Sequence, residues 1–119
     1  MKAANDNKRP VVGMACSQDD VPDFTQLVYV IRCCNCVKIG YSSCLWRREA
    51  EIRRLMLEPT TTLASFLGGP YLETLLHRHF IEYHIENEWF EISGPLKEWV
   101  DAGCPDDLPR ILAERSSAA

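Results

Sequence analysis

The chain has 119 residues, of which 46% are hydrophobic and 25% charged, and its formal net charge at pH 7 is −4. This ordinary globular balance leaves room for one compact domain with a modest core. No apolar run approaches the roughly 20 residues that a membrane span needs, so we expect no contact with a membrane. The polar N-terminus MKAANDNKRP lacks the apolar region of a signal peptide, which predicts a cytoplasmic protein with reduced thiols.

The charge is distributed unevenly along the chain. Residues 25–54 carry six basic and two acidic side chains, a local charge of +4, whereas residues 71–101 carry seven acidic and two basic ones, a local charge of −5. Because a partner responds to the local field more than to the net charge, the basic half can meet phosphate while the acidic half faces elsewhere. Two solvated faces of opposite sign explain the pattern equally well.

The first third of the chain predicts a leader and a hairpin. Residues 1–24 are polar and lack periodicity, apart from a short strand candidate at VVGMA, and we interpret them as a flexible leader. The segments LVYVIRC and CVKIGYS are rich in β-branched and aromatic residues. They predict two strands joined by a tight turn around Cys34 and Asn35, because asparagine tolerates the positive φ of such turns.

Two helices and a third strand are predicted next. Ser42 and Ser43 offer an N-cap, and CLWRREAEIRRLML predicts a helix that Pro59 ends. TTTLASFL predicts a strand, and PYLETLLHRHFIEYHI predicts a helix that begins at Pro70. EWFEI reads as a short extended piece, GPLKEWVDAG as a helix closed by glycine, and the tail as one or two helical turns.

This order of elements predicts the fold class. We expect an α/β (α+β) domain at residues 25–104, with a small three-stranded, mainly antiparallel sheet flanked by helices. Residues 105–119 are expected to form a short C-terminal helix and tail.

The hairpin register decides which side chains meet. With a turn of two or four residues, Tyr29 faces Gly40 and Ile31 faces Lys38, so that these four share one side. A tyrosine, a lysine and a bare glycine on this side predict a shallow site, although a three-residue turn would shift the register. The other side is wholly apolar and is expected to be core: Val28, Val30, Val37 and Ile39.

The first predicted helix carries an arginine within its apolar stripe. At helical spacing Arg48 falls between Leu45 and Ile52, whereas the other arginines of the helix point elsewhere. An inward arginine needs an anionic partner. A structural carboxylate and a substrate phosphate at the helix N-terminus fit this need equally well. The stripe as a whole comprises Leu45, Ile52, Leu55 and Met56.

The second predicted helix has an acidic residue and a histidine beside its stripe of Leu72, Leu76, Phe80 and Tyr83. Glu73 and His77 are one turn apart, close enough to share a metal ion or a water. On spacing alone, we favour the simpler interpretation, a boundary Glu–His pair at the rim of the core.

The cysteines of the hairpin have the spacing of a metal knuckle. Cys33 and Cys36 could bind zinc together with Cys34 and Cys44, but a structural zinc site normally has a second separated pair, which the sequence lacks. A redox pair normally lies where a helix begins, and this one is at a hairpin tip. We therefore expect neither Zn²⁺ nor a redox role, and we interpret the cysteines as incidental.

Taken in order, these pieces resemble the GIY-YIG nuclease superfamily, and most of all its phage-associated branch with a Val-Lys-Ile-Gly strand. YVI and KIG stand where the two signatures are expected, and Arg48 follows Gly40 by eight residues. ETLLHRHF matches a Glu-x-x-Leu-His-x-x-Phe helix, and NEWFEI matches a Glu-Trp-Phe segment. The likeness extends over about residues 27–92.

The resemblance implies a metal-dependent endonuclease that cleaves phosphodiester bonds in DNA, or alternatively in RNA, with one Mg²⁺ or Mn²⁺. It implies that Glu73 binds the metal and that Arg48 stabilises the charge that develops on the phosphate. Tyr29 would orient or deprotonate the attacking water. The remaining site residues implied by the resemblance are Lys38 and His77 as catalytic groups, and Gly40 and Arg47 against the substrate.

The chain departs from the superfamily pattern at two points. Lys38 replaces the tyrosine of the second signature, although lysine can bind phosphate as a point charge. The terminal asparagine of better-known members has no clear counterpart, and Asn87 is only a candidate. The alternative function is therefore a catalytically degenerate module of the same fold that binds nucleic acid or a protein. The sequence leaves open whether the protein forms a homo-oligomer.

Overall fold

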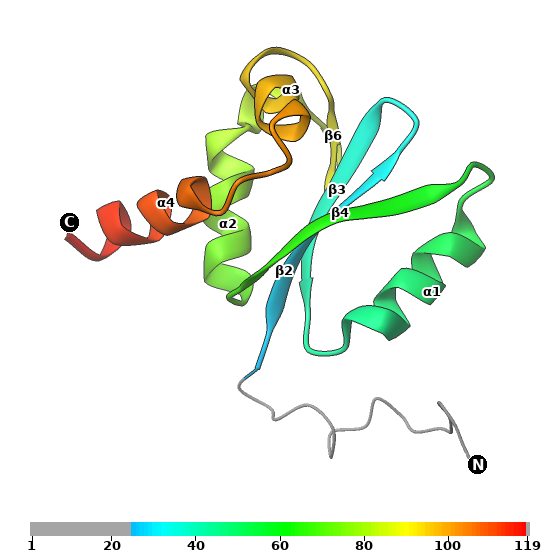
Figure 1. Cartoon of the computed structure of the whole chain (residues 1–119), viewed down its shortest axis with the longest axis horizontal. Helices are drawn as coiled ribbons and strands as arrows, with labels where there is room; N and C mark the ends of the chain where they lie inside the picture. Colours follow the sequence, from blue (N-terminus) through cyan, green and yellow to red (C-terminus); the bar gives the residue numbers. More distant parts are fainter. Residues whose placement is uncertain (1–24, 119) are drawn as a thin grey trace.

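The computed structural model describes residues 25–118, which form a five-stranded sheet with helices on both faces (Figure 1). The strand order is β4-β2-β3-β6-β5, and every neighbouring pair is antiparallel. The strands are β2 (Leu27–Cys33), β3 (Cys36–Ser42), β4 (Thr60–Leu67), β5 (His84–Glu86) and β6 (Trp89–Glu91). The helices are α1 (Leu45–Leu55), α2 (Pro70–His79), α3 (Gly94–Asp101) and α4 (Asp107–Ala118), with a 3₁₀ turn, η1, at Ile81–Tyr83.

The predicted α+β class is confirmed, but the prediction of three strands is wrong. The second predicted helix ends at His79 and not near Ile85, and the chain continues through η1 into a short hairpin, β5–β6. Asn87 closes this hairpin with a φ of 54°, and its carbonyl oxygen lies 2.7 Å from His84 Nε2. The hairpin places Phe90 opposite Val37 of β3, where the phenyl ring is fully buried. The strand candidate VVGMA lies outside the described residues.

The predicted hairpin register is confirmed. Tyr29 pairs with Gly40 and Ile31 pairs with Lys38 across β2 and β3. A two-residue turn joins the strands, and its positive φ of 58° falls on Cys34 and not on Asn35.

The sheet has a core on each face, one large and one small. The large core combines the apolar side of the hairpin with α2, α3 and β6, and it contains the four residues predicted for it. The opposite face is covered by α1 (Figure 1), and there Tyr29 and Ile31 pack against Ile52. Tyr29 and Ile31 are 0% and 1% exposed, so the prediction that this side is a shallow site is wrong for these two residues, which α1 covers.

The ends of α1 also differ from the prediction. Cys44, and not Ser42, occupies the N-cap position of α1. The Ser42 Oγ accepts a hydrogen bond at 2.9 Å from the backbone N–H of Cys44, which lies before the first turn of the helix. Leu55, expected in the buried stripe, is 81% exposed. The helix ends there, and Met56, which follows in an extended conformation, packs against the small core instead.

The C-terminal helix, α4, has 12 residues and is therefore longer than the one or two turns expected. Its Leu108 and Leu112 pack against the large core. Among residues 25–118 no helix is long and apolar enough to cross a membrane.

Candidate functional site

The site lies at the edge of β3 where its pairing with β6 stops. The two strands are paired from Cys36 to Lys38, and the last bond joins the backbone N–H of Ile39 to the carbonyl oxygen of Glu88 at 2.9 Å. Past this point Gly40 lies beside no residue of β6. Side chains from β2, β3, α1, α2 and the β5–β6 hairpin meet at this edge.

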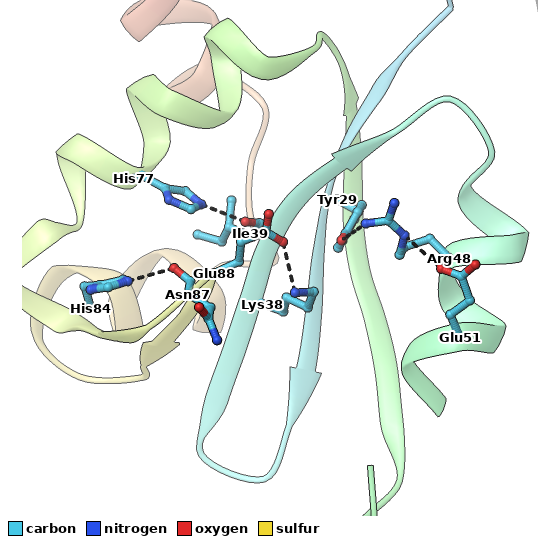
Figure 2. A network of polar contacts seen from close by, with 9 residues as sticks. All are labelled: Tyr29, Lys38, Ile39, Arg48, Glu51, His77, His84, Asn87 and Glu88. Atoms are coloured by element: carbon cyan, nitrogen blue, oxygen red, sulfur yellow. Dashed lines mark hydrogen bonds and ion pairs between the residues drawn. The ribbon is translucent and has the colours of Figure 1, made fainter. Parts of the chain in front are cut away.

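Tyr29 and Arg48 form the pair on the α1 side of the sheet (Figure 2). Arg48 Nη1 donates a hydrogen bond to the Tyr29 hydroxyl oxygen at 3.2 Å, and its Nε lies 3.2 Å from Glu51 Oε1. The structural carboxylate that the sequence analysis allowed for is therefore Glu51. Burial raises the pKa of the Tyr29 phenol above 10.0, against the lowering effect of the Arg48 hydrogen bond. Tyr29 is therefore neutral near pH 7, and its own O–H proton remains available for donation.

Glu73 enters the site from the first turn of α2. Its Oε2 is buried and has no hydrogen-bond partner among residues 25–118. The pKa of its carboxyl is raised from 4.5 to about 7. Burial is the largest cause, the charge of Glu88 and a hydrogen bond between the two carboxyl groups also raise the pKa, and Lys38 and Arg48 act in the opposite direction. A carboxylate in this setting is poorly solvated and gains from a nearby cation.

Lys38 and Glu88 form an ion pair at the centre of the site, with 2.9 Å between Lys38 Nζ and Glu88 Oε1 (Figure 2). The Lys38 side chain is 17% exposed, and its ammonium lies 5.8 Å from the centre of the Trp89 ring. Glu88 was not predicted as a site residue. The available signal was its position in the Glu-Trp-Phe segment, but nothing in the sequence places that segment beside Lys38.

Gly40 is enclosed by the polar atoms of two site residues. A β-carbon on Gly40 would lie 2.5 Å from the Tyr29 hydroxyl oxygen and 2.6 Å from Glu88 Oε1. Real β-carbons do not approach other atoms this closely, so the present arrangement of Tyr29 and Glu88 requires glycine at this position.

The other predicted site residues lie at the periphery. His77 Nε2 is 2.7 Å from the backbone carbonyl oxygen of Ile39, and its ring packs edge-on against Phe90. When Nε2 carries the proton, His77 donates to this carbonyl and ties α2 to β3. Arg47 is exposed on α1, and Asn87 is an exposed residue of the β5–β6 turn.

The structure does not separate the charges as expected. Glu73 and Glu88 belong to the acidic half of the chain, but they lie against Lys38 and Arg48 of the basic half. The prediction that the acidic half faces elsewhere is therefore wrong for these two carboxylates.

Cys33 and Cys36 face each other at the end of the hairpin, and both are free thiols, as is Cys34. Burial raises the pKa of Cys33 and of Cys36, which keeps them in the unreactive thiol form near pH 7. Within the described part of the chain, no three His, Cys, Asp or Glu side chains are grouped so that they could hold a metal ion.

The site thus combines two cations, Lys38 and Arg48, with three carboxylates and a buried phenol at the edge of a small α+β sheet; the carboxylates are those of Glu51, Glu73 and Glu88. The family model of the T5orf172 domain matches residues 26–104, more than half of the chain. The chain therefore belongs to the T5orf172 domain family, which is phage-associated and nuclease-related. No curated protein and no solved structure matches it. The family confirms the phage-associated, nuclease-related part of the resemblance, and the GIY-YIG branch stays a prediction.

Proposed function

We propose that this protein is a metal-dependent endonuclease that hydrolyses phosphodiester bonds, with DNA as its substrate and Glu73 as a ligand of one Mg²⁺ or Mn²⁺. The observation that carries the proposal is the Glu73 carboxylate, whose buried Oε2 has no partner among residues 25–118 although the side chain points into a site rich in charge. An oxygen donor of this kind fits a hard divalent cation, which needs only one or two carboxylates from the protein.

Arg48 is the group that would stabilise the transition state. Its guanidinium is oriented by Tyr29 and Glu51 and is partly exposed, so a phosphate oxygen can reach it. Fixed cations at the point where negative charge develops lower the barrier without reorganisation. A bound divalent ion would supply Lewis-acid activation of the phosphate or of a bound water.

Tyr29 is assigned to orienting the nucleophile. Its hydroxyl accepts a hydrogen bond from Arg48, and its raised pKa keeps the phenol protonated. Because Tyr29 is fully buried, donation to the attacking water or to a phosphate oxygen requires neighbouring side chains to move when the substrate binds. A general base would need the phenolate form, which burial disfavours. Of the two roles that the resemblance implies for Tyr29, orienting the attacking water is therefore favoured over deprotonating it.

The second candidate function is a nucleic-acid-binding module without catalysis. The Lys38–Glu88 ion pair favours it, because Lys38 replaces a catalytic tyrosine of the resembling superfamily and its charge is neutralised by Glu88. Such a module would bind DNA with an affinity that falls as salt rises.

Nicking of supercoiled plasmid with Mg²⁺ or Mn²⁺ separates the two candidates. We expect wild-type protein to nick DNA, EDTA to stop the reaction, and Glu73→Gln and Arg48→Ala to lose at least about 100-fold in rate. The matched control is Arg110→Ala, which removes an exposed arginine of α4 that has an acidic neighbour, Asp106, and is not a site residue. Cleavage that persists in Glu73→Gln contradicts the proposed site, and salt-dependent DNA binding without cleavage establishes the binding module.

A further inference from the structure

Glu88 occupies the space that Gly40 leaves open. Its Oε1 lies 2.9 Å from Lys38 Nζ and 2.6 Å from the point where a β-carbon on Gly40 would stand, and the Tyr29 hydroxyl lies 2.5 Å from the same point. The carboxylate of Glu88 is therefore placed between Lys38 and Tyr29, at the centre of the site and not at its rim.

The carboxyl group of Glu88 also lies close to that of Glu73. The two carboxyl groups are close enough for a hydrogen bond when one of them is protonated, and the charge of Glu88 is the largest charge effect on Glu73. Two carboxylates in contact repel each other unless a proton or a cation lies between them. Mg²⁺ and Mn²⁺ are commonly bound by one or two carboxylates together with water and substrate phosphate.

The backbone holds Glu88 in this position. Its carbonyl oxygen accepts the hydrogen bond from the Ile39 N–H at 2.9 Å. The preceding residue, Asn87, has a left-handed φ of 54°, and its carbonyl oxygen lies 2.7 Å from His84 Nε2. A ligand supported by the strand pairing of β6 is better oriented than one on an unsupported loop.

We infer that Glu88 is a second ligand of the divalent ion at Glu73, and that the Lys38 ammonium competes with that ion for the Glu88 carboxylate. This inference rests on the proposed function in placing the ion at Glu73. Lys38 Nζ and the ion draw on the negative charge of the same carboxylate, so binding of the ion weakens the ion pair. The Lys38 ammonium, which lies 5.8 Å from the centre of the Trp89 ring, can then contact a phosphate oxygen of the substrate.

Calorimetric titration of the full chain with Mn²⁺, without DNA, tests the inference. We expect Glu88→Gln to bind Mn²⁺ about ten-fold or more weakly, because ligand charge sets the affinity for such ions. Lys38→Met is expected to bind about five-fold more tightly, because it removes the competing cation. Glu91→Gln, which changes an exposed carboxylate on β6, is the matched control and should bind as wild type does.

The double variant Lys38→Met/Glu88→Gln separates a ligand from a group that only neutralises Lys38. If Glu88 is a ligand, the double variant binds Mn²⁺ several-fold more weakly than wild type. If Glu88 only neutralises Lys38, the two lost charges cancel and the double variant binds as wild type does, which overturns the inference. Glu88→Asp, which keeps the charge, should bind more tightly than Glu88→Gln, and circular dichroism establishes that each variant is folded.

The same titration distinguishes the two proposals. Loss of Mn²⁺ binding in Glu73→Gln, with unchanged binding in Glu88→Gln, overturns the role of Glu88 and leaves the proposed function intact. Binding that Glu73→Gln leaves unchanged overturns the metal site of the proposed function, and the inference about Glu88 with it.

Discussion

The hydroxyl oxygen of Tyr29 lies only 2.5 Å from the point where a β-carbon on Gly40 would stand, directly across the pairing of β2 with β3. Tyr29 is fully buried beneath α1, so its ring cannot easily move away from Gly40. The absence of a side chain at Gly40 is therefore what allows the phenol, Arg48 and Glu88 to converge at one place.

The first prediction concerns Gly40→Ala. The added methyl group must displace the Tyr29 hydroxyl and the Glu88 carboxylate, and overpacking of this kind costs about 1–3 kcal/mol. Urea denaturation should show this loss of stability, and plasmid nicking should show a loss of cleavage. Gly69→Ala is the matched control, because its β-carbon would meet the flexible end of the Gln26 side chain, which can move away. Equal stability of the two variants would contradict the rigid placement of Tyr29.

The second prediction concerns Tyr29→Phe. The phenyl ring fills the same space beneath α1, so the stability should fall by no more than about 1 kcal/mol, the value of one hydrogen bond to Arg48. Cleavage should nevertheless fall by about ten-fold or more, because the O–H that orients the nucleophile is lost. Rates measured at saturating Mg²⁺ provide the test, with Tyr71→Phe as the control at an exposed tyrosine of α2. Full activity of Tyr29→Phe would exclude the orienting role.

The third prediction concerns the pH dependence of stability. Glu73 has a pKa of about 7 in the folded protein and about 4.5 as its ordinary value. The folded state therefore keeps a proton that the unfolded state releases between these two pH values. The contribution of Glu73 to stability is fully present below about pH 4.5, falls as the pH rises, and levels off above about pH 7.

Thermal unfolding in EDTA at pH 5 and at pH 8 measures this effect. The side chain of Glu73→Gln cannot ionise. The difference between the melting temperatures of the variant and of wild type, variant minus wild type, should therefore be larger at pH 8 than at pH 5. Glu82→Gln, at an exposed position in η1, controls for the general effect of removing a negative charge. A difference for Glu73→Gln that does not change with pH would show that the carboxyl is not shifted by burial.

Local rules were sufficient to predict the hairpin and the groups attached to it. Alternation of apolar residues and a two-residue turn fix the register that places Tyr29 opposite Gly40, and helical spacing turns Arg48 inward. These contacts are between segments adjacent in the sequence. The expectation of an exposed face at Tyr29 failed because burial depends on where α1 packs, which the pattern of either strand alone does not contain.

Of the β5–β6 hairpin, only the extended conformation of EWFEI could be predicted, and β6 confirms it; β5 and the pairing of the two strands could not be predicted, for a related reason. Its strands have three residues each, too few for any periodicity to appear, and helical spacing continues through the residues that form η1 and β5. The contact of Glu88 with Lys38 follows only from the pairing of β6 with β3, a tertiary event between segments about 50 residues apart.

The last prediction concerns His77, which the resemblance makes catalytic and the structure places against a backbone carbonyl. Its Nε2 lies 2.7 Å from the backbone oxygen of Ile39, the residue that precedes Gly40 in β3, and Glu73 is one turn away on the same helix. His77→Ala should lower the free energy of unfolding by about 1–3 kcal/mol, because the carbonyl loses its partner. His77→Gln supplies an amide N–H that can donate to the same oxygen, so it should recover part of both stability and cleavage. If His77 instead transfers a proton in the reaction, His77→Gln will be as inactive as His77→Ala while remaining as stable as wild type, and the pH–rate profile will lose one ionisation.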